Sequence, residues 1–104
     1  MKLSLGYITA PTKKEAKKLA EALLSEGLIA CANIIPAVES LFVWEGEIQK
    51  ANEAVLIIKT REKNEDKIIK FVERHHSYEC PCVVFLPITN GHAEFLRWVD
   101  GSCE

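Results

Sequence analysis

Two histidines and two cysteines lie close together in residues 74–82 of the sequence, at His75, His76, Cys80 and Cys82. Neutral imidazole and thiolate are ligands that copper and zinc ions accept. If the Cys-Pro-Cys triplet is extended, its two thiols point to the same side of the chain, because side-chain direction alternates along an extended chain. The spacing differs from that of a zinc finger. Our first hypothesis is therefore an open site in which His75 and Cys82, with Cys80, bind copper or another heavy-metal ion.

Two other interpretations of the same segment remain open. The histidines can cap the end of the preceding helix by interacting with its carbonyl groups. Cys80 and Cys82 can be small core residues, as free cysteines often are. We expect Cys31, within an apolar run, to be a core residue, and we assign no role to Cys103, which we expect near a frayed terminus.

A second candidate site consists of Trp44, Glu53, Lys59 and Tyr78. Glu53 and Lys59 stand at the two ends of an apolar strand, where charged residues are also common simply because strand ends are wet. Trp44 precedes a Glu-Gly turn and can instead anchor an interface. The functional interpretation is a cleft between subunits that binds a small ligand or a partner protein.

Sequence motifs for catalysis are missing. A Cys/His pair exists on paper, but the sequence has no glycine-rich phosphate loop, no G-x-S-x-G and no H-E-x-x-H. We therefore expect no enzyme. The chain carries 13 Lys and Arg against 15 Asp and Glu, a net charge of −2, which also argues against nucleic-acid binding.

The 104 residues correspond to one domain, residues 1–104. No stretch approaches the ~20 apolar residues that a membrane span requires. The first residues enter an alternating strand pattern and do not resemble a signal peptide. We expect a cytoplasmic protein with reduced thiols.

Hydrophobic periodicity predicts which elements hold these residues. Thr12 and Glu15 form a capping box at the start of the first helix, which Gly27 ends. Thr60 or Asn64 caps the second helix. The predicted strands are 3–9, 28–35, 53–60 and 82–88, with a hairpin over 39–47. The predicted helices are 13–26, one that starts near residue 60 or 64 and runs to about 75, and 93–99. We expect strand 28–35 to be buried on both faces and to end at Pro36.

This order is a twice-repeated βαβ unit, which predicts an α+β fold of ferredoxin-like topology with an inserted hairpin and a short C-terminal helix. Right-handed crossovers place both long helices on one face of a single sheet. No remaining helix is long enough to cover the other face, and the hairpin also carries apolar side chains. We therefore expect the chain to associate with other copies.

Several motifs occur together in one order along the chain: Leu28-Ile29-Ala30-Cys31-Ala32-Asn33, Ser40-x-x-x-Trp44-x-Gly46, Lys59-Thr60, His76-x-Tyr78-x-x-Pro81 and Phe95-Leu96-x-Trp98. As a set they resemble the CutA1 family of divalent-cation tolerance proteins. The resemblance implies a ferredoxin-like homotrimer, similar to the PII signalling proteins, that is linked to tolerance of copper and other divalent ions. It implies no catalytic activity. The alternative is a PII-like regulatory module that binds a small ligand or a protein.

The metal ligands that the resemblance implies are only partly present. Ile8 stands where the family pattern has a cysteine, and Cys82 stands where it has an acid, whereas His75 matches. Cysteine is a softer ligand than carboxylate and favours Cu(I). Ser77 replaces a proline, which makes the loop less stiff.

Overall fold

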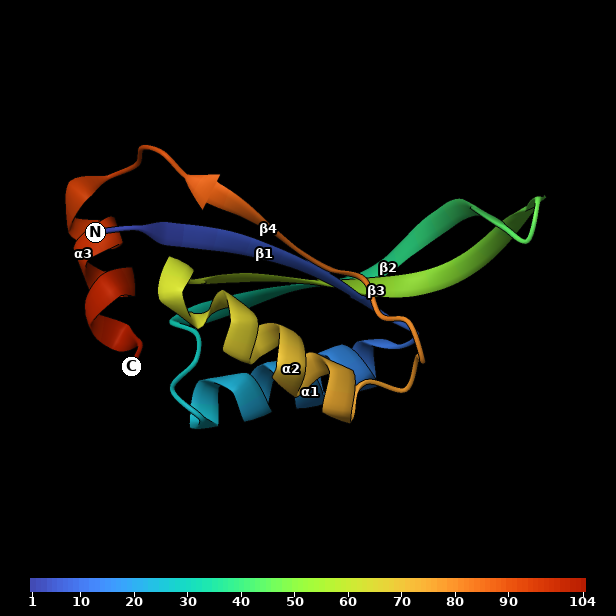
Figure 1. Ribbon diagram of the computed structural model, residues 1–104, viewed down its shortest axis with the longest axis horizontal. Helices are drawn as coiled ribbons and strands as arrows, with labels where there is room; N and C mark the ends of the chain where they lie inside the picture. Colours follow the sequence, from blue (N-terminus) through green and yellow to red (C-terminus); the bar gives the residue numbers. More distant parts are fainter.

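The computed structural model describes residues 1–104, which fold into one antiparallel sheet and three α-helices (Figure 1). The strand order across the sheet is β2-β3-β1-β4, with every neighbouring pair antiparallel. This is the ferredoxin-like arrangement that the sequence predicts. In chain order the elements are β1 (Leu3–Ala10), α1 (Lys13–Ser25), β2 (Cys31–Trp44), β3 (Glu47–Arg61), the 3₁₀ turn η1 (Glu62–Asn64), α2 (Glu65–His75), β4 (Val83–Ile88) and α3 (Ala93–Ser102).

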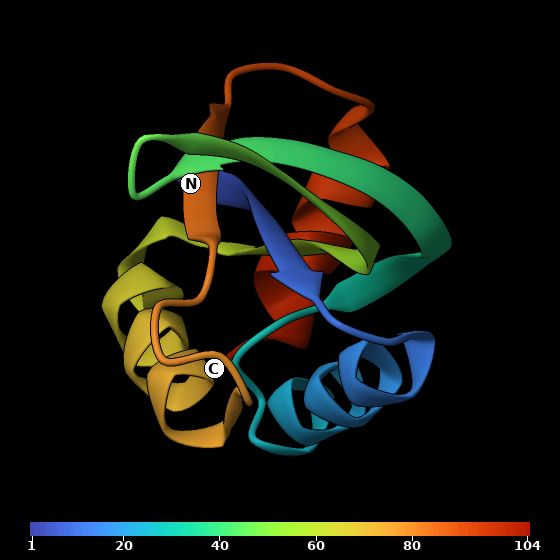
Figure 2. The ribbon, with the colours of Figure 1, turned by 90° about the vertical axis from the view of Figure 1, so that its right-hand side faces the viewer.

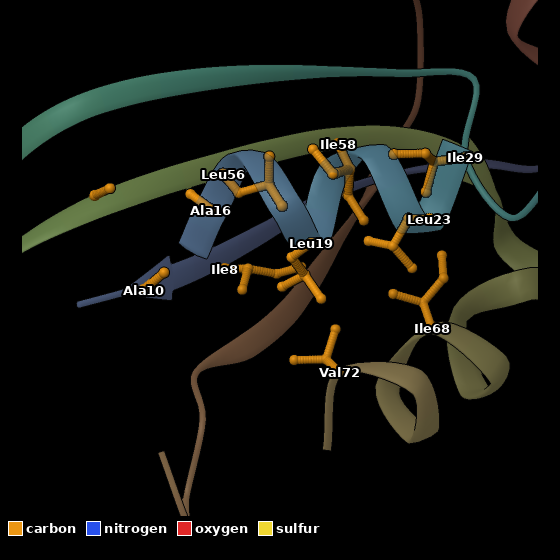
Figure 3. Close-up of a cluster of buried hydrophobic side chains, with 12 residues drawn as sticks. Ile8, Ala10, Ala16, Leu19, Leu23, Ile29, Leu56, Ile58, Ile68 and Val72 are labelled. Atoms are coloured by element: carbon orange, nitrogen blue, oxygen red, sulfur yellow. The ribbon is translucent and has the colours of Figure 1, made fainter. Parts of the chain in front are cut away.

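Helices α1 and α2 cover one face of the sheet (Figures 1 and 2). Side chains from β1 and β3 alternate across the sheet, so every second residue points to these helices. Leu56 and Ile58 of β3 are fully buried against them. Figure 3 shows this core, whose members are Ile8, Ala10, Ala16, Leu19, Ala20, Leu23, Ile29, Ala54, Leu56, Ile58, Ile68 and Val72.

The opposite face of the sheet, which we call the open face, is apolar and largely uncovered. The register places Tyr7 beside Val84 and Leu5 beside Leu86, so these side chains form neighbouring rows on β1 and β4. Val84 is 53% exposed and Leu86 is 62% exposed. Helix α3 lies only against one end of the sheet (Figure 1). The predicted uncovered face is therefore present in the single chain.

Strand β2 corrects the prediction for this part of the chain. It is an edge strand and is not buried on both faces, and it continues past Pro36 to Trp44. A register shift lies between Ile35 and Val38, so Pro36 falls in a bulge at the sheet edge. Proline is tolerated there because no ladder hydrogen bond is lost. Cys31 is half-buried on this edge strand and is absent from the core cluster, so its predicted core position is also wrong.

The hairpin is the continuation of β2 and β3 and not a separate insertion. Its two strands have 14 and 15 residues and project beyond the rest of the sheet (Figure 1). The turn residues Glu45 and Gly46 both have positive φ, 52° and 79°, as a type I′ turn requires. We call residues 39–52 the arm; its exposed apolar side chains are Leu41, Phe42, Val43, Trp44 and Ile48.

The predicted helix caps are confirmed in position and only partly in chemistry. Thr12 Oγ1 accepts from the Glu15 N–H at 3.1 Å, but the Glu15 carboxylate turns to Ser77 and not back to the cap. Asn64 occupies the cap position of α2 without a capping hydrogen bond from its side chain. Its amide donates instead to the Leu28 carbonyl at 3.3 Å.

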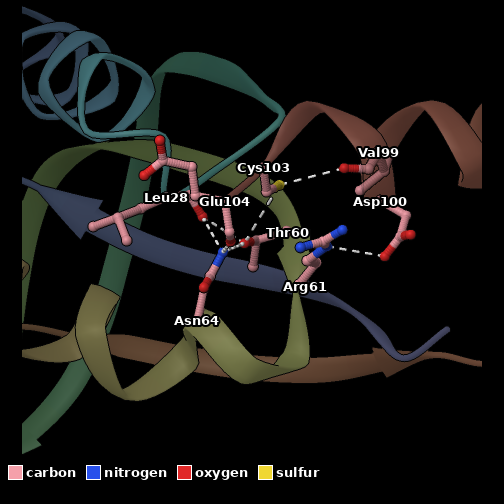
Figure 4. Close-up of polar contacts among 8 residues, drawn as sticks. All are labelled: Leu28, Thr60, Arg61, Asn64, Val99, Asp100, Cys103 and Glu104. Atoms are coloured by element: carbon pink, nitrogen blue, oxygen red, sulfur yellow. Dashed lines mark hydrogen bonds and ion pairs between the residues drawn. The ribbon is translucent and has the colours of Figure 1, made fainter.

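The C-terminus is held in place and is not frayed (Figure 4). The Glu104 N–H donates to the Gly27 carbonyl at 2.9 Å, and the Asn64 amide donates to Glu104 O at 2.8 Å. Cys103 is buried, and its thiol donates to the Val99 carbonyl at 3.3 Å. These contacts join residues that are distant in sequence, so local patterns do not reveal them.

None of the helices has the length and apolar character that crossing a bilayer requires.

Candidate functional site

The loop between α2 and β4 carries the predicted metal ligands, and a buried histidine fixes its first residues. His76 follows the last residue of α2, and its side chain is fully buried. Its Nε2 donates to the Thr9 carbonyl at 2.7 Å, and its Nδ1 accepts from the Tyr78 N–H at 2.9 Å. A carbonyl only accepts and a backbone N–H only donates, so the ring is the neutral tautomer protonated at Nε2. Neither nitrogen is free to bind a metal ion.

Glu15 on α1 holds the next residue of the loop. Its Oε2 accepts from both the N–H and the hydroxyl of Ser77, each at 3.0 Å. Burial raises the pKa of Glu15, but the two hydrogen bonds from Ser77 and the attraction of nearby basic side chains, among them Lys18, together outweigh it and lower the pKa below 4.5. The same Oε2 lies 3.5 Å from His76 Nδ1. Because that nitrogen already accepts from Tyr78, we regard the contact as polar and not as an ion pair.

Tyr78 connects the loop to β3. Its hydroxyl donates to Glu53 Oε2 at 3.0 Å. Burial raises the pKa of Tyr78 to about 12, and the carboxylate of Glu53 adds to this effect, so the phenol stays protonated and keeps donating at neutral pH. The loop is therefore fastened to the end of β1, the start of α1 and the middle of β3 before it reaches the cysteines.

His75 has a different environment from its neighbour. It is the last residue of α2 and is exposed, and its ring stacks on Phe71 with centroids 4.1 Å apart. Nδ1 lies 2.8 Å from the Phe71 carbonyl four residues earlier, so this nitrogen is the donor. The helix-capping interpretation is thus confirmed for His75. In the neutral ring, its Nε2 keeps a free lone pair, and a metal ion binds histidine through such a nitrogen.

The two cysteines follow at the end of the loop. Cys80 is exposed, which excludes a core role for it, and Cys82 is half-buried directly before β4; both are free thiols. No group of three or more His, Cys, Asp or Glu side chains in the chain is arranged to hold a metal ion. The ligands proposed from the sequence therefore lie in one segment but form no complete metal site within a single chain.

The second predicted cluster is only partly assembled. Tyr78 and Glu53 are in contact. Trp44 is 56% exposed near the tip of the arm, and the register pairs Glu53 with Val38, six residues before Trp44. At about 3.3 Å per residue this places Trp44 roughly 20 Å away along the strand. The predicted cleft is not formed within one chain.

Lys59 lies equally far from Glu53 in the other direction along β3. Its Nζ donates to Asn33 Oδ1 at 2.9 Å on the edge strand. Lys59 is therefore also outside the contact between Glu53 and Tyr78.

Sequence reasoning missed the roles of Thr9, Glu15 and His76, which depend on contacts between elements far apart in the chain. The one available signal was the position of His76 immediately after a helix end.

The family of this chain follows from comparison with known proteins. The family model of the CutA1 divalent ion tolerance protein matches residues 4–102. The chloroplastic protein CutA 1 of Oryza sativa is 44% identical over 96 residues, which cover 92% of this chain and 54% of that protein. The chain thus spans about half the length of this plant relative. The divalent-cation tolerance protein CutA of Archaeoglobus fulgidus is 44% identical over 98 residues, covering 94% of this chain and 95% of that protein.

Solved structures agree with the sequence relatives. The crystal structure of CutA1 from Oryza sativa has a TM-score of 0.97 at 40% identity, covering 100% of this chain and 95% of that one. The structure of the periplasmic divalent cation tolerance protein CutA from Archaeoglobus fulgidus has a TM-score of 0.94 at 41% identity, covering 98% and 99%. This chain belongs to the CutA1 divalent ion tolerance protein family.

Proposed function

We propose that this protein contributes to tolerance of divalent cations by binding copper through Cys80, Cys82 and His75. The observation that carries the proposal is the accessibility of soft donors in one anchored loop: an exposed thiol, a half-buried thiol and an imidazole nitrogen with a free lone pair. The relatives' names describe tolerance of divalent cations and no reaction. The proposal therefore contains no catalytic step.

The donor set favours Cu(I) over harder ions. Thiolates select Cu(I), whereas carboxylates and water suit magnesium, calcium and manganese. A single chain gathers no three such ligands as it stands. We therefore propose that the two thiols supply the main bonds and that His75 moves toward them as a weaker third ligand when the metal binds. Thiolate ligation requires reduced cysteines, which is consistent with the cytoplasmic location that we propose.

We also propose that the working form is a homotrimer whose copies cover one another's open faces. Tyr7, Val84 and Leu86 expose an apolar sheet surface, and the arm exposes Phe42 and Trp44. A lone subunit with this much exposed apolar surface favours association. The arm would extend onto a neighbouring copy, which would bring its side chains near another subunit's loop.

A copper titration tests the site directly. Cu(I) is titrated into the wild type and into Cys80→Ser/Cys82→Ser in competition with a chromogenic Cu(I) chelator. Loss of both thiolates should weaken binding at least about 100-fold, because the remaining imidazole is a single and less soft ligand. Cys31→Ser is the control, because it removes a thiol on the edge strand and should leave the affinity unchanged.

The same titration on His75→Ala tests the third ligand, with a smaller loss expected. Equal Cu(I) binding by the wild type and the double cysteine variant would overturn the site. Light scattering on each sample checks that all variants have the same molecular mass, so that changes in assembly are not mistaken for changes in ligation.

The PII-like alternative has less support. Of its four predicted cleft residues, only Tyr78 and Glu53 meet within the chain. The family model and the Archaeoglobus fulgidus relative are named for tolerance of divalent ions and not for regulation. We therefore keep metal binding as the proposed function.

A further inference from the structure

A groove runs between α1 and α2, away from the metal-binding loop's cysteines and from the open face. It consists of two adjoining hollows that share Ala22 and His75. Figure 2 shows the two helices side by side on the same side of the sheet. Charged and titratable residues line the groove from both helices: Lys14, Glu15, Lys18 and the C-cap residue Glu26 on the α1 side, and Arg74 and His75 on α2. Because α1 and α2 lie on the opposite side of the sheet from the open face, an assembly formed through the open faces would leave this groove accessible.

Three cations lie on the rim of the groove: Lys14, Lys18 and Arg74. None of them forms an ion pair within 4.0 Å, because the chain's two such contacts involve Arg61 and His76, although Lys18 still attracts the nearby Glu15 carboxylate. Glu15 also lines the groove, but its carboxylate is occupied by the two hydrogen bonds from Ser77. Glu26 is the second acid of the groove, so three cations stand against two carboxylates, a small positive excess in a chain whose net charge is −2.

The floor of the same groove is apolar. Leu19 is buried and Ala22 is half-buried on α1, and Phe71 is half-buried on α2 under the ring of His75. A phosphate or a nucleic-acid backbone gains nothing from such a floor. A short peptide with an apolar side chain flanked by carboxylates complements both the floor and the rim.

We propose that the groove between α1 and α2 docks an acidic amphipathic segment of another protein. One apolar side chain of the segment packs over Ala22 and Phe71, and its carboxylates pair with Lys14, Lys18 and Arg74. Apolar burial supplies affinity, whereas the charges set orientation and exclude basic partners. This proposal does not depend on copper, because none of the three cations is a proposed metal ligand.

The test uses a fluorescein-labelled synthetic helical peptide with glutamates one turn apart and leucines on the adjoining face. Binding is followed by fluorescence anisotropy with the full chain, in chelator and reductant, so that metal plays no part. We expect saturable binding that weakens with added salt. Lys14→Glu/Lys18→Glu should weaken it by about tenfold or more, because two attractions become repulsions.

Lys13→Glu/Lys17→Glu is the matched control. It changes the net charge equally, on the same helix and at the same spacing, but neither residue lines the groove. Its affinity should stay within about twofold of the wild type. Thermal melts of both variants confirm that they are folded.

Several results would overturn the proposal. These are undetectable binding, an equal loss in both double variants, or equal binding of a peptide whose leucines are replaced by serine. Tighter binding of glutarate or of a single-stranded oligonucleotide would instead identify a small carboxylate or a nucleic acid as the occupant, and would also refute a protein segment. Failure of copper binding leaves all these measurements unaffected, so the two proposals fail separately.

Discussion

The two faces of the sheet have similar side chains and very different surroundings. On the helix-covered face, Leu56 and Ile58 are fully buried. On the open face of the same sheet, Val84 and Leu86 are more than half exposed. The alternation of each strand sends comparable apolar residues to both sides, so composition does not distinguish them.

What differs is the source of the cover. The crossover connections between strands place α1 and α2 on one face, so that face is covered by its own chain. Only one end of the open face receives a helix, α3 (Figure 1). One face is therefore closed when the chain folds, whereas the other stays uncovered until, as we propose, another copy associates with it.

The largest effect is expected from a charge placed on the open face. In Leu86→Asp, an assembly through this face would bury an unpaired carboxylate, at a cost of several kcal/mol per copy, roughly 3 or more. The variant should sediment as an 11.7 kDa monomer, whereas the wild type should sediment as a larger particle. Lys70→Asp, on the exposed surface of α2, is the control and should keep the wild-type mass. An unchanged mass for Leu86→Asp would refute association through the open face.

A cavity on the helix-covered face should affect folding and leave the assembly interface itself intact. Leu56→Ala removes a fully buried side chain from the core cluster and should lower the free energy of unfolding by about 2–5 kcal/mol. Urea denaturation at fixed protein concentration measures it. Leu24→Ala, on the exposed side of α1, should lose less than about 1 kcal/mol. Similar losses for the two variants would show that the covered face is not the core.

A smaller loss of folding free energy is expected at Gly6, where the helix-covered face has no room for an added side-chain carbon. A Cβ at Gly6 would lie 2.6 Å from Ile58 Cγ1 and 2.9 Å from Phe85 Cε1. Gly6→Ala should therefore lower the free energy of unfolding by about 1–3 kcal/mol, because neighbouring side chains must shift. Gly101→Ala provides the contrast: nothing lies within 4 Å of that Cβ, and alanine favours the helix. If Gly6→Ala is as stable as the wild type, the packing described for this face is wrong.

The smallest effect concerns pH. The folded pKa of Glu15 is lowered below 4.5, so its stabilising contribution is complete above that pH and is lost as the pH falls through the folded pKa. The melting temperature of Glu15→Gln should be below that of the wild type at pH 7, and the difference should shrink as the pH falls below 4.5. Glu21→Gln, an exposed neighbour on α1, should show no such convergence. A constant difference between Glu15→Gln and the wild type would contradict the lowered pKa.

Much of the fold could be predicted from local patterns. The helix over Lys13–Ser25 has its apolar period, its Thr12 cap and its glycine stop all within one stretch of sequence. The prediction failed at β2, because whether a strand is central or at an edge depends on its partners and not on its own residues. Pro36 marked a bulge within that strand and not its end.

The candidate site, too, could be predicted only in part from the sequence. The residue types in 74–82 indicate metal ligands, and their order along the chain is all that the sequence contains. It could not separate His75, whose Nε2 is free, from His76, whose two nitrogens are both hydrogen-bonded. That difference arises because Thr9, 67 residues earlier, happens to lie beside His76 in the folded chain.

Local patterns were enough to predict the helices, most strands, their order and the two apolar faces, because hydrophobic period and caps act between residues a few positions apart. The tertiary structure alone decided which face is covered, which histidine is free, and that Glu53 meets Tyr78 but not Trp44. Those outcomes depend on the register and direction of whole elements, and a contact across the fold leaves no trace in the spacing of the residues that make it.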